Sequence, residues 1–294
     1  MLTQHELLRS VRHIEIRTDR LSDDLFAGGY HSVFKGRGLE FDEVREYMPG
    51  DDIRSIDWNV TARTGSPHVK NYVEERELTV VLVVDASGSL DFGTQERSKS
   101  QAAAELCALL AFSAIKNNDK VGLVTFTEDV ELYLPPKKGR KQVLRVIREV
   151  LHFERERRGT DLQTALEFVS RTLTRRAVVF VVSDFRDEGY TDALTVLARK
   201  HDVIAVDLFD PRERDLGRVG LIELEDAETG RRALVDTSVA GLGRVHATAE
   251  ERSCTARQHF FSARGIDVIP ITTAAPPVDP LVGFFERRRR RMRR

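Results

Sequence analysis

The stretch VVLVVDASGS, residues 80–89, decides the fold of this chain. Five apolar residues, four of them β-branched, run into an aspartate and a short loop that contains glycine. A continuous β-branched run is typical of a strand buried on both faces, as in a parallel sheet covered by helices. The residues that follow it, Asp85, Ser87 and Ser89, place polar oxygens where the predicted strand leaves the sheet.

Strand-like and helix-like segments alternate after this stretch. The expected strands are residues 80–84, 121–126, 130–134, 177–183, 203–208 and 267–271. The expected helices cover about 95–115, 139–152, 162–173 and 190–198. This alternation indicates an α/β fold with a doubly wound, mostly parallel sheet, in which 130–134 is the hairpin strand at the edge.

Residues 1–78 do not show this alternation of strands and helices. They are expected to form an N-terminal helix and a small β subdomain. A capping box of Thr3 and Glu6 predicts a helix over about 4–18. Short β-like segments follow between glycines and prolines. They cover residues 39–47, 53–58 and 69–73. The α/β domain is then expected over 79–275, and residues 276–294 form a C-terminal segment with an arginine-rich tail.

One predicted hairpin, residues 219–237, interrupts the α/β alternation. Its strands, 221–224 and 233–236, flank the turn residues Glu228-Thr229-Gly230. A lone hairpin is barely stable in water, so we expect it to complete the N-terminal sheet.

Charge is unevenly distributed. Residues 287–294 contain seven arginines, and without them 39 basic residues face 47 acidic ones, a net charge of −8. A body of that sign repels nucleic acid, so such a contact could come only from the tail. Because the tail has no interleaved aromatics and the chain no nucleic-acid motif, no nucleic-acid partner is expected. The tail is expected to be mostly disordered, and contact with a membrane surface is expected only through it.

The two cysteines, Cys107 and Cys254, have no disulfide-framework or zinc spacing, which favours a reducing compartment. The N-terminus lacks an apolar segment of signal-peptide length, and no apolar run approaches the ~20 residues that span a bilayer. We therefore expect a cytoplasmic location.

Two further segments add oxygen ligands at the same sheet edge. Asp184 follows the apolar run 177–182, and Thr160 lies in a Gly-Thr-Asp loop before a helix. Each has a simpler reading, since Asp184 could cap a turn and Thr160 a helix. Together with residues 85–89 they make a hard-oxygen set that suits Mg²⁺ best, with Mn²⁺ or Ca²⁺ as alternatives.

DASGS, GTD and the strand-terminal SD resemble the metal-ion-dependent adhesion site (MIDAS) of von Willebrand factor A domains. The resemblance implies metal-binding roles for five residues: Asp85, Ser87, Ser89, Thr160 and Asp184. Two carboxylates and three neutral hydroxyls leave a divalent ion under-compensated, so it would attract a carboxylate from a partner protein.

A second resemblance spans nearly the whole chain. The segments KGRGLEF (35–41), VREY (44–47), PGDDIRSIDW (49–58), DAETG (226–230) and VDT (235–237) resemble the domain-of-unknown-function 58 family of bacterial proteins. This resemblance implies a partnership with AAA+ ATPases of the MoxR type. Many members of that family carry transmembrane helices.

A charge cluster surrounds the only tryptophan, Trp58. Its members are Asp51, Asp52, Arg54, Asp57 and Arg63. They could form a partner surface, but a structural ion-pair network is the favoured interpretation.

The leading hypothesis is a non-enzymatic, metal-dependent adaptor that works with a MoxR-type ATPase in the assembly or maturation of protein complexes. The alternative is a metal-dependent hydrolase with Asp161, Asp187 or Glu188 as its base. Against it, Ser87 lacks a Gly-x-Ser-x-Gly elbow and no histidine lies near it in sequence.

Overall fold

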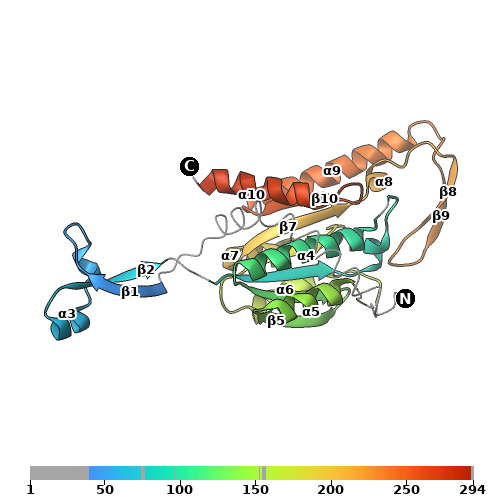
Figure 1. The fold of residues 1–294 in the computed structure, drawn as a ribbon. Coiled ribbons are helices and arrows are strands. Elements are labelled where there is room, and N and C mark those ends of the chain that lie inside the picture. The colour runs from blue at the N-terminus through green and yellow to red at the C-terminus, as the bar shows by residue number, and fades with distance from the viewer. Residues whose placement is uncertain (1–39, 74–76, 96, 152, 154–156, 293–294) are drawn as a thin grey trace. The chain divides into compact units, whose positions relative to one another are not determined.

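The computed structural model describes residues 40–73, 77–95, 97–151, 153 and 157–292. The chain divides into two compact units, one of residues 34–78 and one that includes residues 79–294 (Figure 1). The helix predicted over 4–18 lies outside the described residues.

The small unit contains an antiparallel pair, β1 (Glu40–Glu46) and β2 (His68–Val73). A β-like segment was predicted over 53–58, but only Ile56 pairs as a strand residue, in an isolated β-bridge with Val69. The 3-10 turn η1 (Ile53–Ser55) precedes Ile56 and helix α3 (Trp58–Thr64) follows it. The carboxylate of Asp57 accepts hydrogen bonds from the first amides of α3, so the chain is capped into a helix before it can extend.

The large unit is built on a six-stranded sheet in the order β10-β7-β6-β3-β4-β5. Five strands are parallel, and β5 runs antiparallel to β4 at the edge. The strands are β3 (Thr79–Asp85), β4 (Lys120–Phe126), β5 (Val130–Lys137), β6 (Val178–Ser183), β7 (Asp202–Phe209) and β10 (Asp267–Thr272). The predicted doubly wound, mostly parallel fold is confirmed.

Helices cover both faces of this sheet. They are α4 (Lys99–Lys116), α5 (Arg140–Leu151), α6 (Leu162–Thr172), α7 (Thr191–Lys200), α8 (Pro211–Arg214), α9 (Leu242–Ala263) and α10 (Val278–Met292). Val81 and Val83 of β3 share a core cluster with α6, α7 and Phe261 of α9. Because side chains alternate along a strand, Val80 and Leu82 point to the opposite face, and they too are fully buried.

The strand order reverses at β3. The chain continues to β4 and β5 on one side, whereas β6, β7 and β10 lie on the other. Val84 of β3 pairs with Val182 of β6, so Asp85 and the Ser183-Asp184 end of β6 reach the same edge. Such a switch point is where open α/β sheets bind their ligands.

The predicted hairpin forms as β8 (Leu221–Glu225) and β9 (Arg232–Asp236). Buried Thr237 closes its base, because the Thr237 hydroxyl and amide both donate to the carbonyl of Gly220. Within the large unit, the described strands β8 and β9 pair with each other, and the pairing with the N-terminal sheet stays a prediction.

The C-terminal segment is helical. Leu281, Phe284 and Phe285 of α10 are buried, and Arg288 pairs with Asp202 and Asp267. The expectation of a mostly disordered arginine tail is therefore wrong for the part of the tail within α10. No helix in the described ranges is both long and apolar enough to cross a membrane.

Candidate functional site

Asp85 and the turn after it form the centre of the candidate site. The carboxylate of buried Asp85 accepts hydrogen bonds from the amide of Ser87, at 2.8 Å, and from the hydroxyl of Ser183, at 2.8 Å. The hydroxyl oxygens of Ser87 and Ser89 lie 3.0 Å apart on the 3-10 turn η2 (Gly88–Asp91). The strand end and turn thus bring one carboxylate and two hydroxyls together.

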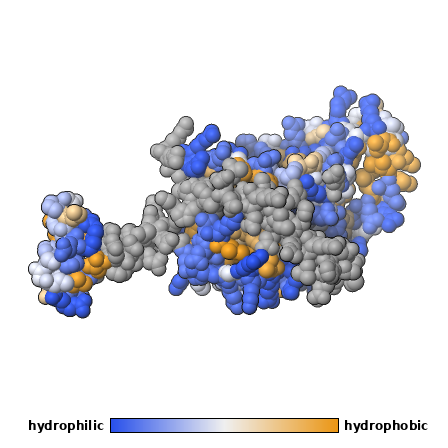
Figure 2. Space-filling view, viewed as in Figure 1, coloured by the Kyte–Doolittle hydropathy of each residue, from blue (hydrophilic) through white to orange (hydrophobic). Residues whose placement is uncertain are grey.

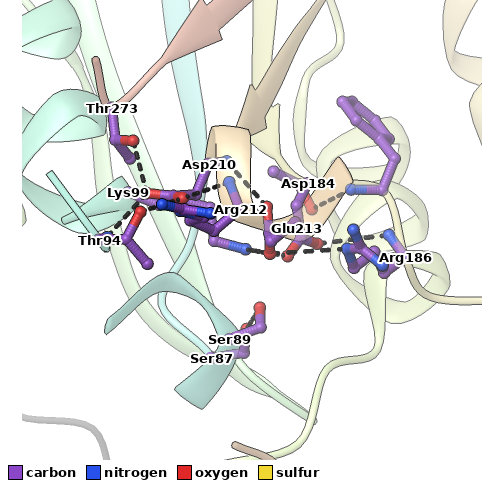
Figure 3. A network of polar contacts seen from close by, with 12 residues as sticks. Ser87, Ser89, Thr94, Lys99, Asp184, Arg186, Asp210, Arg212, Glu213 and Thr273 are labelled. Atoms are coloured by element: carbon purple, nitrogen blue, oxygen red, sulfur yellow. Dashed lines mark hydrogen bonds and ion pairs between the residues drawn. The ribbon is translucent and has the colours of Figure 1, made fainter. Parts of the chain in front are cut away.

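Asp184 follows β6 at the site, and its carboxylate forms an ion pair with the side chain of Lys99. The buried ammonium of Lys99, in the first turn of α4, lies 2.7 Å from Oδ2 of Asp184 and 2.7 Å from Oε1 of Glu213 (Figure 3). Arg186 donates to both carboxylate oxygens of Glu250, at 3.1 and 3.0 Å, and lies near Glu213. This network links the sheet edge to α8 and α9.

The two site carboxylates have different protonation behaviour. Burial, and then the negative charge of Asp184, raise the pKa of Asp85 to about 7. Burial also opposes ionisation of Asp184, but Lys99 more than offsets it and holds the pKa of Asp184 below its usual value. Of these two carboxylates, Asp85 is therefore the one whose ionised form a bound cation would stabilise more.

Thr160 lies on a loop held against the same turn. The amide of Gly88 donates to the carbonyl of Arg158, at 2.9 Å, and the amide of Asp161 donates to Thr127, at the end of β4. The hydroxyl of Thr160 donates to a carboxylate oxygen of Glu228, at 2.6 Å. The structure thus brings the loop of Thr160 to the serine turn, and it adds a carboxylate from the tip of the hairpin.

A cavity of about 160 Å³ borders the site between η2, α4 and α5, and Asp85 and Ser87 contribute to its wall. Small-molecule sites usually have volumes of about 300–1,000 Å³. The cavity is therefore better matched to an ion with its waters, or to one side chain, than to a metabolite.

Two of the three candidate hydrolase bases are engaged in local hydrogen bonds. The carboxylate of Asp161 accepts hydrogen bonds from the amide and hydroxyl of Thr164 and caps α6. The carboxylate of Asp187 accepts hydrogen bonds from the amides of Leu162 and Glu188.

In the small unit, Asp51 forms a bidentate ion pair with Arg45. Asp52 and Asp57 cap η1 and α3. Trp58 is 68% exposed, so these carboxylates do not enclose it.

Sequence reasoning missed four residues near the site: Lys99, Asp210, Glu213 and Glu228. Buried Asp210 accepts hydrogen bonds from Thr94 and Thr273 and forms a capping box with Glu213 (Figure 3). The sequence Asp-Pro-x-Glu at 210–213 is typical of a capping box, so this part of the network could have been predicted from the sequence. Lys99 and Glu228 carry no comparable local signal.

Comparison with known proteins places the chain in a family. Residues 43–255 match the family model described as "Protein of unknown function DUF58". The chain belongs to the DUF58 family. An uncharacterized protein of Mycobacterium tuberculosis is 31% identical over 290 residues, which cover 97% of this DUF58 chain and 90% of that protein. The expected relation to bacterial proteins is thus confirmed.

Solved structures also show partial likeness to this DUF58 protein. An aerotolerance-related membrane protein from Bacteroides fragilis has a TM-score of 0.48 at 15% identity, covering 73% of this chain and all of that one. The VWA domain of SpRpn10 has a TM-score of 0.42 at 13% identity, covering 70% and 94%. The expected cytoplasmic location is corrected here, since a similar structure belongs to a protein described as a membrane protein.

Proposed function

We propose that this protein is a non-enzymatic protein-binding module that captures a partner's carboxylate through one divalent cation at the β3–β6 edge. The observation that carries the proposal is buried Asp85, whose pKa is raised to about 7, beside the hydroxyls of Ser87 and Ser89. A buried carboxylate without a compensating cation destabilises a fold, and a bound cation relieves that cost.

The donor set fits a hard divalent ion. Ser87, Ser89 and Thr160 would supply hydroxyl oxygens, and Asp85 and Asp184 would supply the negative charge. Among the described residues no cluster of three or more His, Cys, Asp or Glu side chains stands ready for a metal, so the hydroxyls are essential to this proposal. Oxygen ligands favour Mg²⁺ first, with Mn²⁺ or Ca²⁺ as substitutes.

The charge balance favours a partner with an acidic side chain. Lys99 offsets part of the Asp184 charge, so Asp85 and Asp184 together do not fully balance the two charges of a divalent ion. When bound, the cation would supply a positive centre for an external carboxylate. The serine turn and the loop of Thr160 would hold the cation in place and so fix where the partner's carboxylate binds.

The proposed partner is a MoxR-type AAA+ ATPase, in line with the family resemblance. The hydrolase alternative loses two of its three candidate bases, because the carboxylates of Asp161 and Asp187 are engaged as helix caps, and Glu188 is its remaining candidate. A general base needs a carboxylate within hydrogen-bond reach of the reacting proton.

Binding of purified MoxR-type ATPase from the same organism, measured by interferometry, tests the proposal. We expect binding in Mg²⁺ that is lost in chelator and lost for Asp85→Asn. The exposed helical residue Asp192 provides the matched control, and Asp192→Asn is expected to bind normally. Equal binding by wild type and Asp85→Asn, with and without Mg²⁺, would contradict the proposal.

A further inference from the structure

The tip of the β8–β9 hairpin lies against the candidate metal site. Besides the 2.6 Å hydrogen bond from Thr160 to Glu228, the backbone of the tip touches the serine turn. A Cβ added to Gly88 would meet the carbonyl oxygen of Ala227 at 2.5 Å. Gly88 is therefore required as glycine because the backbones of two distant segments meet there.

The tip has a defined conformation that presents Glu228. Asp226 accepts hydrogen bonds from the amides of Glu228 and Thr229 and from the hydroxyl of Thr229. The amide of Gly230, which has a φ of +69°, returns to the carbonyl of Asp226 at 2.7 Å. This ordered turn lowers the entropic cost of holding the Glu228 carboxylate at Thr160.

The rest of the hairpin is weakly held. Figure 2 shows a hydrophobic patch on the hairpin surface, and Leu221 and Leu234 there are 68% and 71% exposed. Only Ile222 and Val235 of its strands are half-buried. A hairpin that buries so little apolar surface can leave the domain at low cost while Thr237 still closes its base.

We propose that Glu228 is the chain's own carboxylate ligand for the metal site, so that an acidic partner binds by displacing the hairpin tip. This inference rests on the proposed function, because it assumes a cation held by Ser87, Ser89 and Thr160. In the free protein, the Glu228 carboxylate would then occupy the coordination position that a partner's carboxylate takes in the complex. A partner would need a carboxylate that competes with Glu228 and a surface that tolerates the displaced hairpin.

Manganese alone is the probe for this inference. Binding is followed by the EPR signal of free Mn²⁺, and water access to bound Mn²⁺ by water-proton relaxation. The test variant is Glu228→Gln, since an amide oxygen still accepts the Thr160 hydrogen bond but carries no charge. Glu223→Gln is the control, because Glu223 lies on β8 of the same hairpin and contacts Arg232.

We expect Glu228→Gln to weaken Mn²⁺ binding about tenfold, since ligand charge sets affinity at such sites. It should also raise the relaxation enhancement, because water replaces the carboxylate, while Glu223→Gln matches wild type in both measurements. If wild type binds Mn²⁺ and Glu228→Gln leaves either quantity unchanged, the inference is overturned and the metal site stands. If wild type binds no Mn²⁺, the proposed function and this inference fail together.

Discussion

The ammonium of Lys99 lies 2.7 Å from the carboxylate of Asp184, and both side chains are buried. The Coulomb attraction acts between residues 85 positions apart in sequence and joins α4 to the end of β6. Burial by itself would lower the pKa of Lys99, but Asp184 and Glu213 raise it above its usual value. Lys99 is therefore charged in the folded protein and is a fixed part of the site.

Lys99→Met should destabilise the protein by about 3–5 kcal/mol, because it leaves a buried carboxylate without its cation. Urea denaturation in chelator measures the loss. In a double-mutant cycle, Asp184→Asn should recover part of it, with a coupling energy above about 1 kcal/mol. Strictly additive effects would show that the two groups do not interact. Exposed Lys141→Met is the control and should change stability little.

Asp210→Ala should cost about 3 kcal/mol near neutral pH, since hydrogen bonds to a buried charged acceptor are strong. Burial alone would raise the pKa of Asp210, but the hydrogen bonds from Thr273 and Thr94 hold it below its usual value. A lowered pKa stabilises the fold above the unfolded value, and this contribution is lost as the pH falls through the folded pKa.

The difference between wild type and Asp210→Ala should therefore shrink as urea titrations move from about pH 7 to about pH 3. A difference that stays constant would mean that the Asp210 charge plays no part. Exposed Asp215→Ala provides a comparison and should cost under about 1 kcal/mol.

Gly88→Ala should loosen the hairpin tip, because the new Cβ would lie 2.5 Å from the carbonyl oxygen of Ala227. Hydrogen exchange should speed up across residues 226–231, and overall stability should fall by about 1–3 kcal/mol. Gly243 in α9 has open space at its Cβ, so Gly243→Ala should be neutral or slightly stabilising. Unchanged exchange at the tip of Gly88→Ala would argue against the contact.

The two free thiols should react very differently. Cys107 is fully buried, and burial raises the pKa of its thiol to about 12, whereas Cys254 on α9 is only half-buried. Because the thiolate is the nucleophile, only Cys254 should react with an aromatic disulfide reagent in the native state. Both should react in denaturant, and two fast equivalents in native protein would contradict the burial of Cys107.

Much of the fold could be predicted because apolar runs and their periodicity are local signals. The strand 80–84 and the run ending at Asp184 placed two carboxylates at one sheet edge, as observed. The segment 53–58 was misread because its apolar residues suggested a strand, whereas the caps Asp52 and Asp57 decide its conformation.

The missed part of the site depends on contacts between distant segments. Glu228 reaches Thr160 across 68 positions, and the turn sequence around it predicts a hairpin but not its docking place. Lys99 follows a helix cap, where a lysine ordinarily faces solvent. Neither the contact of Glu228 with Thr160 nor that of Lys99 with Asp184 can be predicted from a local sequence pattern, since only the folded sheet brings these residues together.

Anomalous diffraction from crystals grown with Mn²⁺ would locate a bound cation directly. We expect one strong peak within coordination distance of the hydroxyls of Ser87 and Ser89, and we expect it to be lost in Asp85→Asn. No peak at saturating Mn²⁺, or one that persists in Asp85→Asn, would contradict a metal-dependent binding site at this edge of the sheet.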